Sequence, residues 1–459
     1  MREYELIIDE ALRKGLSPDK IPNNAQFLFE CLGFRCGIGR LESHVPLTNP
    51  IPVTIDMYYS WPFPQFLVGE EFHIMVVRDT VNQEDDVYLV SEDHATVTPI
   101  FQVDVLTFGK GTLMEMADFG EYVFMTNGVL MIYWDLTLGA WQVMTSSTLI
   151  PMMRTICNFK GMAVGGCVLS PWYDCDETFF IWTRPGYMDF TPSQENETGY
   201  RRCPYGGEVY HVRRLGDIVV GYSSKGVTFL IPSSEPTPTM GFMEMCNIGL
   251  INRGAMNGSL NRHIFVGEDY IVREVTKEGV KELGYQYYME QLTNGDIIVT
   301  YNPHKKDFYI SDGTKTFLLS PFGMTEVLQH PSAVWRSNGS SYIIPEVIDS
   351  RSPLICTEPF DMGYRGQKTI SSIETDAHIT LDPEAGVDYS SLAGWIIEHY
   401  KPINNEGIAA ITVSGDTFRF RLRFEAVYDN TVISYLKARY KMTDLRGIRG
   451  VYAPPLRGQ

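Results

Sequence analysis

Two short acidic segments hold residue types that could do chemistry. They are Glu84-Asp85-Asp86 and Asp174-Cys175-Asp176-Glu177. Cleavage of a glycosidic bond requires two carboxylates, one acting as an acid and the other as a nucleophile or base. Both segments are expected at turn tips between strands, where acidic side chains are normally just hydrated. The sequence therefore favours solvated loops, and glycan cleavage is the alternative.

Signatures whose spacing carries a mechanism do not occur in the sequence. HExxH, GxxxxGK[ST], GxSxG and the EF-hand loop are all missing. The nine histidines are isolated, without a second ligand type at the spacing of a metal site, and the eight cysteines form no CxxC pair. We therefore predict buried free thiols, no catalytic, cofactor-binding or metal-binding residues, and a protein that is not an enzyme.

Basic residues alternate with apolar ones on two strands expected near the end of the sequence. Side chains at i and i+2 of a strand lie on one face, so the alternation places the cations together and the apolar side chains opposite them. If the two strands pair, their cations form one patch. The candidate interface residues are Arg419, Arg421, Arg423, Lys437, Arg439 and Lys441.

The rest of the chain is acidic. With 38 Lys and Arg against 56 Asp and Glu, the formal net charge is −18, which excludes a generally basic nucleic-acid binder. Residues 418–459 hold nine basic and three acidic residues, so this segment is +6 and the remainder is −24. The basic strands are thus expected to meet an acidic partner or a neighbouring copy, with a solvated strand face as the alternative.

The composition indicates β structure. The chain contains 26 Tyr, 24 Phe, 40 Gly and 26 Pro. Aromatic residues fit pleated surfaces, while Gly and Pro supply turns and interrupt helices. No window approaches the ~18 consecutive apolar residues of a membrane span, and the acidic start differs from a signal peptide. We expect a soluble protein without a membrane span, made in a cytoplasm.

Residues 67–360 repeat one pattern of an apolar strand, a turn and an aromatic-rich strand. The centres of the first strands are expected at Met75, Val123, Val164, Val219, Phe265 and Ile298. Their intervals straddle the ~40–50-residue period of a four-stranded propeller blade, and a shorter unit at 332–347 could close the ring. Asn127-Gly128 is a strong two-residue hairpin signal. We expect a β-propeller-like domain of about 6–7 blades; a series of β-sandwiches is the alternative.

The two ends of the chain are expected to form separate parts. Apolar residues at helical spacing predict a helix over the first fifteen residues that Gly15 ends, and residues 16–66 are punctuated by proline like an extended strap. Residues 361–459 read as a C-terminal β module with long strands, in which 391–400 fits either a helix or a strand. The expected domains are therefore 1–66, 67–360 and 361–459.

Both ends also carry a resemblance to a known class of proteins. Residues 15–47 contain a short polar turn with Pro18 and Pro22, then a strand through Leu32 and Phe34. Residues 361–374, 418–424 and 436–450 carry the matching closing pattern. Together with the repeating middle, these segments resemble structural proteins of tailed bacteriophage virions, in particular the propeller-bearing tail proteins of the nozzle or hub class.

The resemblance implies a non-enzymatic tail component in the virion, synthesised in the bacterial host cytoplasm. Such a protein forms a symmetric ring of copies, contacts neighbouring tail proteins and contributes to the conduit for genome ejection. DNA passes without specific binding, which suits a net charge of −18, because an acidic wall repels phosphate at short range. The alternative is a glycan-binding or glycan-cleaving β-propeller used in host adsorption.

Overall fold

The structure is a computed structural model in which, over the described residues, strands far outnumber helices. It contains strands β1 to β39 but only the short helices α1 and α2 within that part of the chain. The mainly β fold class is therefore confirmed. The described residues are 3–19, 26–44, 46–47, 63–67, 70–79, 84–91, 97–103, 115–120, 122–126, 128, 131–135, 140–143, 150–172, 174–191, 197–233, 239–331, 333–337, 340–344, 349–363, 366–377, 383–391, 394–397, 400–425 and 431–443.

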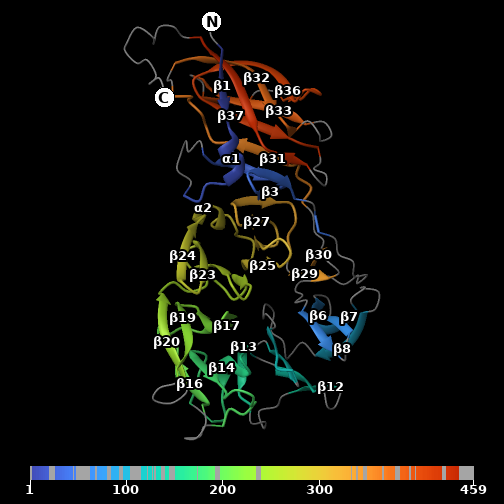
Figure 1. Ribbon diagram of the computed structural model, residues 1–459, viewed down its shortest axis with the longest axis vertical. Helices are drawn as coiled ribbons and strands as arrows, with labels where there is room; N and C mark the ends of the chain where they lie inside the picture. The colour runs from blue at the N-terminus through green and yellow to red at the C-terminus, as the bar shows by residue number, and fades with distance from the viewer. Residues whose placement is uncertain are drawn as a thin grey trace. The chain divides into compact units, whose positions relative to one another are not determined.

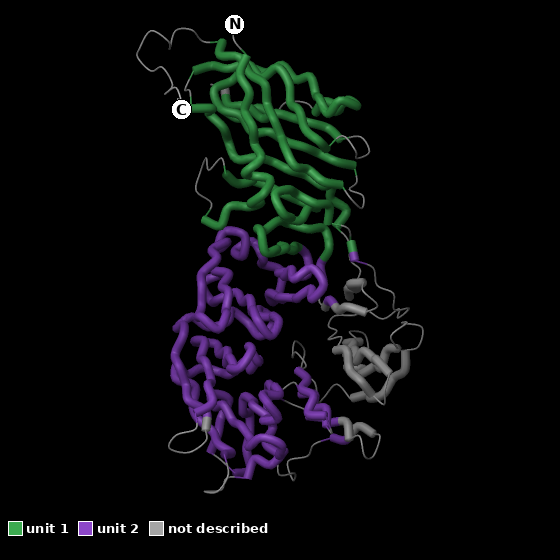
Figure 2. Tube along the Cα trace, in the orientation of Figure 1, with its two compact units in different colours: residues 1–46, 315–329, 348–459 green, residues 47–314, 330–347 purple. Residues whose placement is uncertain are grey.

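The chain divides into two compact units (Figure 2). Unit 1 comprises residues 1–46, 315–329 and 348–459, and unit 2 comprises residues 47–314 and 330–347. The formal charge is unevenly divided between them. By sequence, unit 2 holds 34 acidic and 18 basic residues, which gives −16 and leaves −2 for unit 1.

This division corrects the three expected domains, because the two ends of the chain fold together. Strand β1 (Glu3–Ile7) pairs along its whole length with β39 (Leu436–Met442). Strand β2 (Leu28–Leu32) pairs with β31 (Leu354–Thr357). Backbone hydrogen bonds between strands that are far apart in sequence are invisible to local composition, so the expected boundaries at 66 and 360 were wrong.

Unit 2 contains four-stranded antiparallel sheets whose strands follow one another in sequence order (Figure 1). Short strands separated by turn residues form meanders of this kind. Five such sheets are described. Their strands are β5 (Phe63–Leu67), β6 (Glu70–Asp79), β7 (Glu84–Ser91) and β8 (Val97–Val103); β9 (Glu115–Asp118), β10 (Tyr122–Thr126), β11 (Met131–Asp135) and β12 (Ala140–Val143); β13 (Met152–Phe159), β14 (Met162–Leu169), β15 (Phe179–Trp182) and β16 (Gly199–Arg202); β17 (Val209–Leu215), β18 (Ile218–Ser223), β19 (Val227–Ser233) and β20 (Thr239–Cys246); and β21 (Met256–Gly258), β22 (His263–Val266), β23 (Val272–Thr276) and β24 (Gly279–Gly284).

The sheets of unit 2 are arranged like propeller blades. The first strand of one sheet contacts the first strand of the next for β9 with β13 and for β13 with β17. Strand β21 contacts β25 (Ile298–Asn302) in the same way, and β25 contacts β29 (Ala333–Ser337). Radial repetition of four-stranded sheets around a centre makes successive inner strands neighbours. The β-propeller-like central domain is thus confirmed.

Two further hairpins continue the series in unit 2. Strand β25 pairs with β26 (Asp307–Ser311), and β29 pairs with β30 (Ser340–Ile344). Helix α2 (Gln286–Met289) precedes them. One local detail was wrong: Thr126 pairs with Met131, so four residues rather than two lie between β10 and β11.

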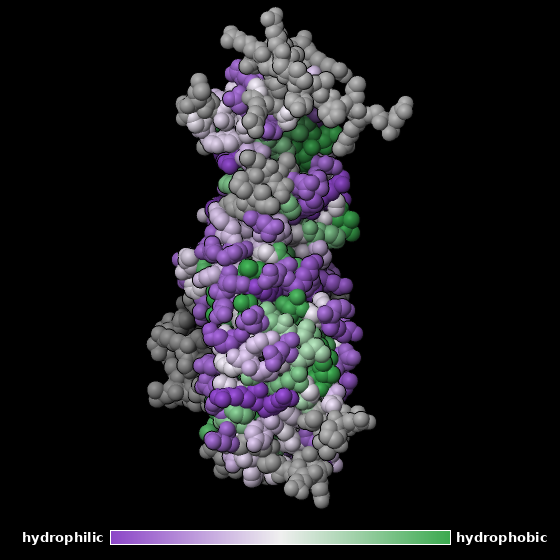
Figure 3. All heavy atoms as spheres, turned by 90° about the vertical axis from the view of Figure 1, so that its left-hand side faces the viewer, coloured by the Kyte–Doolittle hydropathy of each residue, from purple (hydrophilic) through white to green (hydrophobic). Residues whose placement is uncertain are grey.

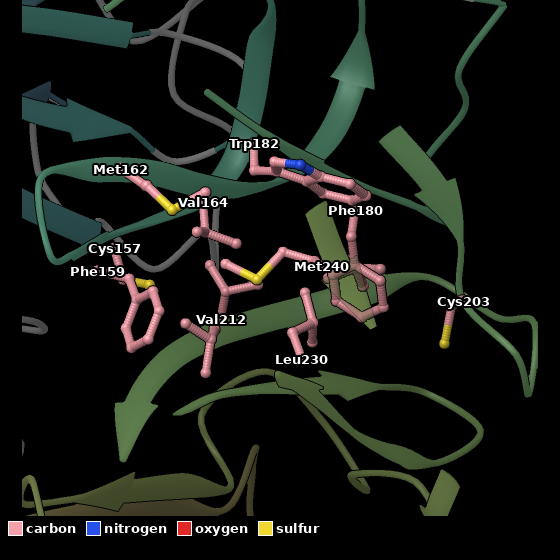
Figure 4. Close-up of a cluster of buried hydrophobic side chains, with 12 residues drawn as sticks. Cys157, Phe159, Met162, Val164, Phe180, Trp182, Cys203, Val212, Leu230 and Met240 are labelled. Atoms are coloured by element: carbon pink, nitrogen blue, oxygen red, sulfur yellow. The ribbon is translucent and has the colours of Figure 1, made fainter. Parts of the chain in front are cut away.

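Apolar side chains from neighbouring sheets meet face to face in unit 2 (Figure 4). Phe180 and Trp182 of β15 lie with Leu230 of β19 and Met240 of β20 in one buried cluster. Gly221 of β18 is required here, because an added Cβ would lie 2.4 Å from the ring of Phe180. A Cβ at that distance cannot be accommodated without movement, so the close approach of the two sheets depends on glycine.

Unit 1 consists of sheets built from both ends of the chain. One has the strand order β1-β39-β32-β36. Another runs β27-β28-β2-β31-β37-β33-β34, with β35 also on β33, and a small sheet has the order β3-β4-β38. Figure 1 shows the blue strand β1 among the orange and red strands. The remaining bounds are β3 (Phe34–Gly37), β4 (Arg40–Ser43), β27 (Thr316–Leu319), β28 (Met324–Val327), β32 (Lys368–Thr375), β33 (Glu384–Ser391), β34 (Gly394–Ile397), β35 (Lys401–Pro402), β36 (Ile408–Gly415), β37 (Phe418–Arg423) and β38 (Val432–Ile433).

The helix expected over the first fifteen residues is only half present. Residues Glu3–Ile7 form β1, and helix α1 spans Asp9–Lys14. Gly15 ends the helix as expected, with φ of 69° in the left-handed region that glycine tolerates. Glu3, Glu5 and Ile7 also fit the two-residue period of a strand, so the sequence is compatible with both a helix and a strand. Pairing with β39 selects the strand.

The C-terminal strands agree partly with expectation. Residues 408–415 and 418–423 form β36 and β37, and the ambiguous segment 391–400 contains strand β34 rather than a helix.

The surface seen in Figure 3 is mostly hydrophilic, with smaller apolar groups among the polar residues. Exposed large apolar side chains include Ile7, Ile38, Trp395 and Ile396 in unit 1. Within the described residues, neither helix has the length and apolar character needed to cross a bilayer.

Candidate functional site: the basic strands and a buried charge cluster

Strand β37 carries three of the six candidate cations on one face, as the alternation predicts. Phe418, Phe420 and Leu422 are buried on the opposite face. The neighbouring strand β33 supplies two carboxylates: Glu384 lies directly opposite Arg423, and Asp388 lies directly opposite Arg419 and diagonal to Arg421. β37 therefore presents its arginines toward acidic groups of the same sheet.

Two of these arginines form ion pairs with β33. Arg421 Nε donates to Asp388 Oδ2 at 2.7 Å, and both side chains are largely buried, with exposed fractions of 19% and 4%. Arg423 Nη2 donates to Glu384 Oε2 at 2.5 Å, but its side chain is 49% exposed. The Arg421 pair is therefore protected from water and salt, whereas the Arg423 pair is screened.

Arg419 is held by aromatic rings. Its guanidinium carbon lies 4.4 Å from the ring centroid of Phe29 and 4.6 Å from that of Trp395 on β34. Cation–π attraction operates at such distances, and it grows when the cation is desolvated. The arginine thus braces the orientation of Trp395, which is itself 46% exposed.

The three cations of β39 lie between acidic residues of the two flanking strands. Lys437 Nζ is 3.0 Å from Glu5 on β1 and 3.7 Å from Glu374 on β32. Arg439 Nη2 is 3.0 Å from Glu374, and Lys441 Nζ is 3.8 Å from Glu3 of β1. These three cations are neutralised inside unit 1, as are Arg421 and Arg423 of β37.

The single cationic patch expected from pairing of the two basic strands is not formed. β37 pairs with β31 and β33, whereas β39 pairs with β1 and β32 in another sheet. The sequence did not reveal the partners, because Glu3, Glu5, Glu374, Glu384 and Asp388 are far from the cations in sequence. A role of the six residues in meeting a partner remains a prediction.

Unit 2 contains a buried charge cluster that sequence reasoning missed. Glu115 begins β9, Thr155 lies in β13, and His211 and Arg213 lie in β17, so the cluster joins three successive inner strands. Thr155 Oγ1 donates to Glu115 Oε2 at 2.5 Å and accepts from the Val212 backbone N–H at 2.9 Å. Glu115 and His211 are 2% and 0% exposed.

The protonation pattern of this cluster follows from its partners. His211 Nδ1 contacts Glu115 Oε1, and His211 Nε2 contacts the backbone oxygen of Arg253. Both ring nitrogens therefore face oxygen atoms inside the cluster. Burial by itself would raise the pKa of Glu115, but the charges of Arg213 and His211 and the hydrogen bonds from His211 and Thr155 outweigh it and lower the pKa to about 2.

The cluster is suited to holding the blades together rather than to chemistry. Every oxygen of the Glu115 carboxylate already has a donor, and Arg213 Nη2 lies 3.4 Å from Oε1. A general base or acid needs access to a substrate proton. A fully buried carboxylate with complete partners has no such access, so we assign it a structural role.

The acidic segment 174–177 is also occupied by local contacts. Thr178 donates to Asp176 Oδ1 from its backbone N–H at 2.8 Å and from its hydroxyl at 2.5 Å, and these bonds lower the pKa of Asp176. Glu177 lies 2.8 Å from Arg154. The acid of a glycosidase needs a raised pKa, which Asp176 lacks. Residues 84–86 lie at the start of β7, but their side chains are not among the described parts.

Metal ligation has no candidate in the described ranges. Among those residues, no three His, Cys, Asp or Glu side chains come close enough together to hold an ion. The cysteines are all described; all eight are free, and seven of them are buried. The expectation of buried free thiols is confirmed for these seven.

Comparisons with known proteins add little to this geometry. No family model matches the chain, and no curated protein matches it. Similar solved structures include two of Hsv2 from Kluyveromyces lactis, one of them titled as having a complete loop 6CD. They are 9% and 10% identical, cover 53% of this chain and 76% and 77% of theirs, and have TM-scores of 0.32. A likeness at this level carries no argument, so the propeller-like description rests on the strand contacts above.

Proposed function

We propose that the chain is a non-enzymatic structural protein of a tailed phage virion, a ring-forming tail component that contributes to the DNA conduit and attaches neighbouring tail proteins. The observation that supports this is that unit 1 is built from both ends of the chain, which are the parts that carry the resemblance. Strand β2 belongs to the first segment that carries the resemblance, and β37 belongs to a later one; both pair with β31. The segments that carry the resemblance thus join in one body, although they are far apart in sequence.

The charge distribution also supports the proposal. Unit 2, with its propeller-like sheets, carries −16 of the net charge, whereas unit 1 is near neutral at −2. An acidic wall repels DNA phosphate within about a Debye length, ~8–10 Å at moderate salt. A near-neutral body with internally paired cations is suited instead to protein contacts, because its surface does not repel an acidic neighbour.

The side-chain chemistry favours a non-enzymatic role. The Glu115 carboxylate is buried and fully partnered, and Asp176 and Glu177 are engaged by Thr178 and Arg154. None of these groups is an available nucleophile with an adjacent base. The proposed role therefore uses the strands as scaffold and the surfaces as contacts.

The test is assembly of the purified full chain. Light scattering coupled to size exclusion should give a mass that is a fixed multiple of 52.1 kDa, and negative-stain images should show rings. Mass spectrometry of phage particles from the producing host should find the chain in the tail fraction. A protein that stays monomeric at all concentrations and is missing from particles would overturn the proposal, and release of reducing sugar from host glycans would favour the alternative.

A further inference from the structure

Two cysteines of unit 2 have thiols that are hydrogen-bonded to each other. Cys167 lies in β14, and Cys175 lies in the irregular segment between β14 and β15. Both are free thiols in one buried cluster, and they are 1% and 9% exposed. The fold thus brings two oxidisable sulfur atoms into contact, although the sequence marks the pair with no CxxC motif.

A second pair of buried cysteines in unit 2 provides the contrast. Cys157 and Cys203 also share one buried cluster, but Figure 4 shows them at opposite ends of it. A disulfide requires two β-carbons only ~3.5–4.5 Å apart, so burial in a common cluster is not sufficient. Direct contact between the thiols distinguishes Cys167 and Cys175 from this pair.

The segment that contains Cys175 also joins two neighbouring sheets. The Glu177 carbonyl accepts from the backbone N–H of Val209, which begins β17, at 2.8 Å. The Glu177 carboxylate lies 2.8 Å from Arg154 of β13. A covalent bond from Cys175 to β14 would therefore restrain the segment that holds β17 beside the sheet of β13 to β16. Such a bond also reduces the freedom of the unfolded chain.

We propose that Cys167 and Cys175 form a redox site, in which a low-molecular-weight disulfide closes a reversible bond between them and fixes this junction. The Cys175 thiolate attacks one sulfur of the reagent, whose S–S bond breaks and releases one thiolate. The Cys167 thiolate then attacks the Cys175 sulfur and expels the second reagent thiolate. Two electrons pass to the reagent, and the two cysteine protons end on its two thiols. The inference is independent of the proposed tail role.

Cys175 is the attacking thiol because it is the more exposed of the two and lies outside the strands. Burial raises the pKa of Cys175 to about 11, with Asp176 and Asp174 adding to the effect, and burial also raises the pKa of Cys167. Only a small fraction of either thiol is ionised near neutral pH, so closure of the bond is slow there. A reducing compartment keeps both cysteines as thiols, whereas an oxidising one closes the bond.

The test starts from the folded full chain with all cysteines reduced. The chain is incubated with oxidised glutathione at mildly alkaline pH, the remaining thiols are alkylated under denaturing conditions, and the peptides are mapped by mass spectrometry. We expect a peptide that links Cys167 to Cys175 and no link between Cys157 and Cys203. The Tm of unit 2 should rise by about 5 °C, and dithiothreitol should reverse the rise.

Two variants separate the bond from packing. Cys175→Ser keeps a group that can hydrogen-bond to Cys167 but cannot form a disulfide, so oxidation should no longer raise the Tm. Cys246→Ser is the matched control, because Cys246 is the partly exposed thiol, and its loss should leave the link and the rise in Tm intact.

The outcomes test the bond and its effect separately. Alkylation of both Cys167 and Cys175 after the incubation would overturn the inference, as would a link that forms only in the unfolded chain. A linked chain with an unchanged Tm, or an equal rise in Cys175→Ser, would overturn the proposed restraint of the junction.

Discussion

The buried carboxylate Glu115 should be among the most stabilising charged groups of unit 2, and Glu115→Gln tests this. The substitution keeps the shape and one acceptor for Thr155 but removes the charge that balances His211 and Arg213. Breaking one side of a buried ion pair costs about 3–5 kcal/mol, because the partner charges remain desolvated. We expect a large loss in the free energy of unfolding and a weakened junction between β9, β13 and β17.

The pKa of Glu115 gives a second estimate of how much its charge contributes to the free energy of unfolding. The pKa of Glu115 is lowered from its ordinary 4.5 to about 2. One pKa unit corresponds to about 1.4 kcal/mol, so the ionised form stabilises the fold by about 3 kcal/mol. Because the pKa is lower in the folded state, this stabilisation is complete above about pH 4.5 and is lost as the pH falls toward 2.

Urea unfolding of the wild type and of Glu115→Gln, followed at several pH values, checks both magnitudes. The difference in free energy should be about 3 kcal/mol or more at pH 6 and should shrink as the pH approaches 2. Glu268→Gln is the matched control, because its pair with Lys225 is exposed and should be worth less than about 1 kcal/mol. Equal effects of the two variants, or a difference that is independent of pH, would refute the reasoning.

Three further predictions concern packing, pairing and thiols. Arg421→Ala should lower the free energy of unfolding of unit 1 by about 3 kcal/mol, since it leaves Asp388 buried and unpaired, whereas Arg423→Ala should cost less than about 1 kcal/mol; equal costs in urea unfolding would contradict this. Gly221→Ala should cost about 1–3 kcal/mol through overpacking, and an unchanged Tm would show that the sheets can separate. In the native chain only the partly exposed Cys246 should react readily with a thiol reagent, and all eight thiols should react after unfolding; several fast thiols before unfolding would be inconsistent with the burial.

The propeller-like part could be predicted because its signals are local. Met75 pairs with Tyr88 and Val164 pairs with Trp182, in hairpins whose strands are close in sequence. Alternation and turn residues specify such pairs within short windows. A local signal can still misplace a turn: Asn127-Gly128 predicts a two-residue turn, whereas four residues separate β10 from β11.

Unit 1 could not be predicted in this way, because its decisive contacts are long-range. Residues Glu3–Ile7 satisfy both a helical and an alternating pattern, and only β39, more than 400 residues later, selects the strand. Local propensity is a weak prior that tertiary pairing overrides. A domain boundary placed from proline content at residue 66 fails for the same reason.

The basic strands show why charge alternation does not identify an interface. Arg421 and Asp388 are 33 residues apart, and Arg439 and Glu374 are 65 apart, so the sequence displays the cations without their partners. An alternating row of cations is the same whether the opposite row lies on the next strand or on another molecule. The distinction requires the register, which here assigns acids of β1, β32 and β33 to five of the six cations and aromatic rings to Arg419. Among the described strands, β34 ends its sheet and exposes Trp395, a feature that charge alternation does not display.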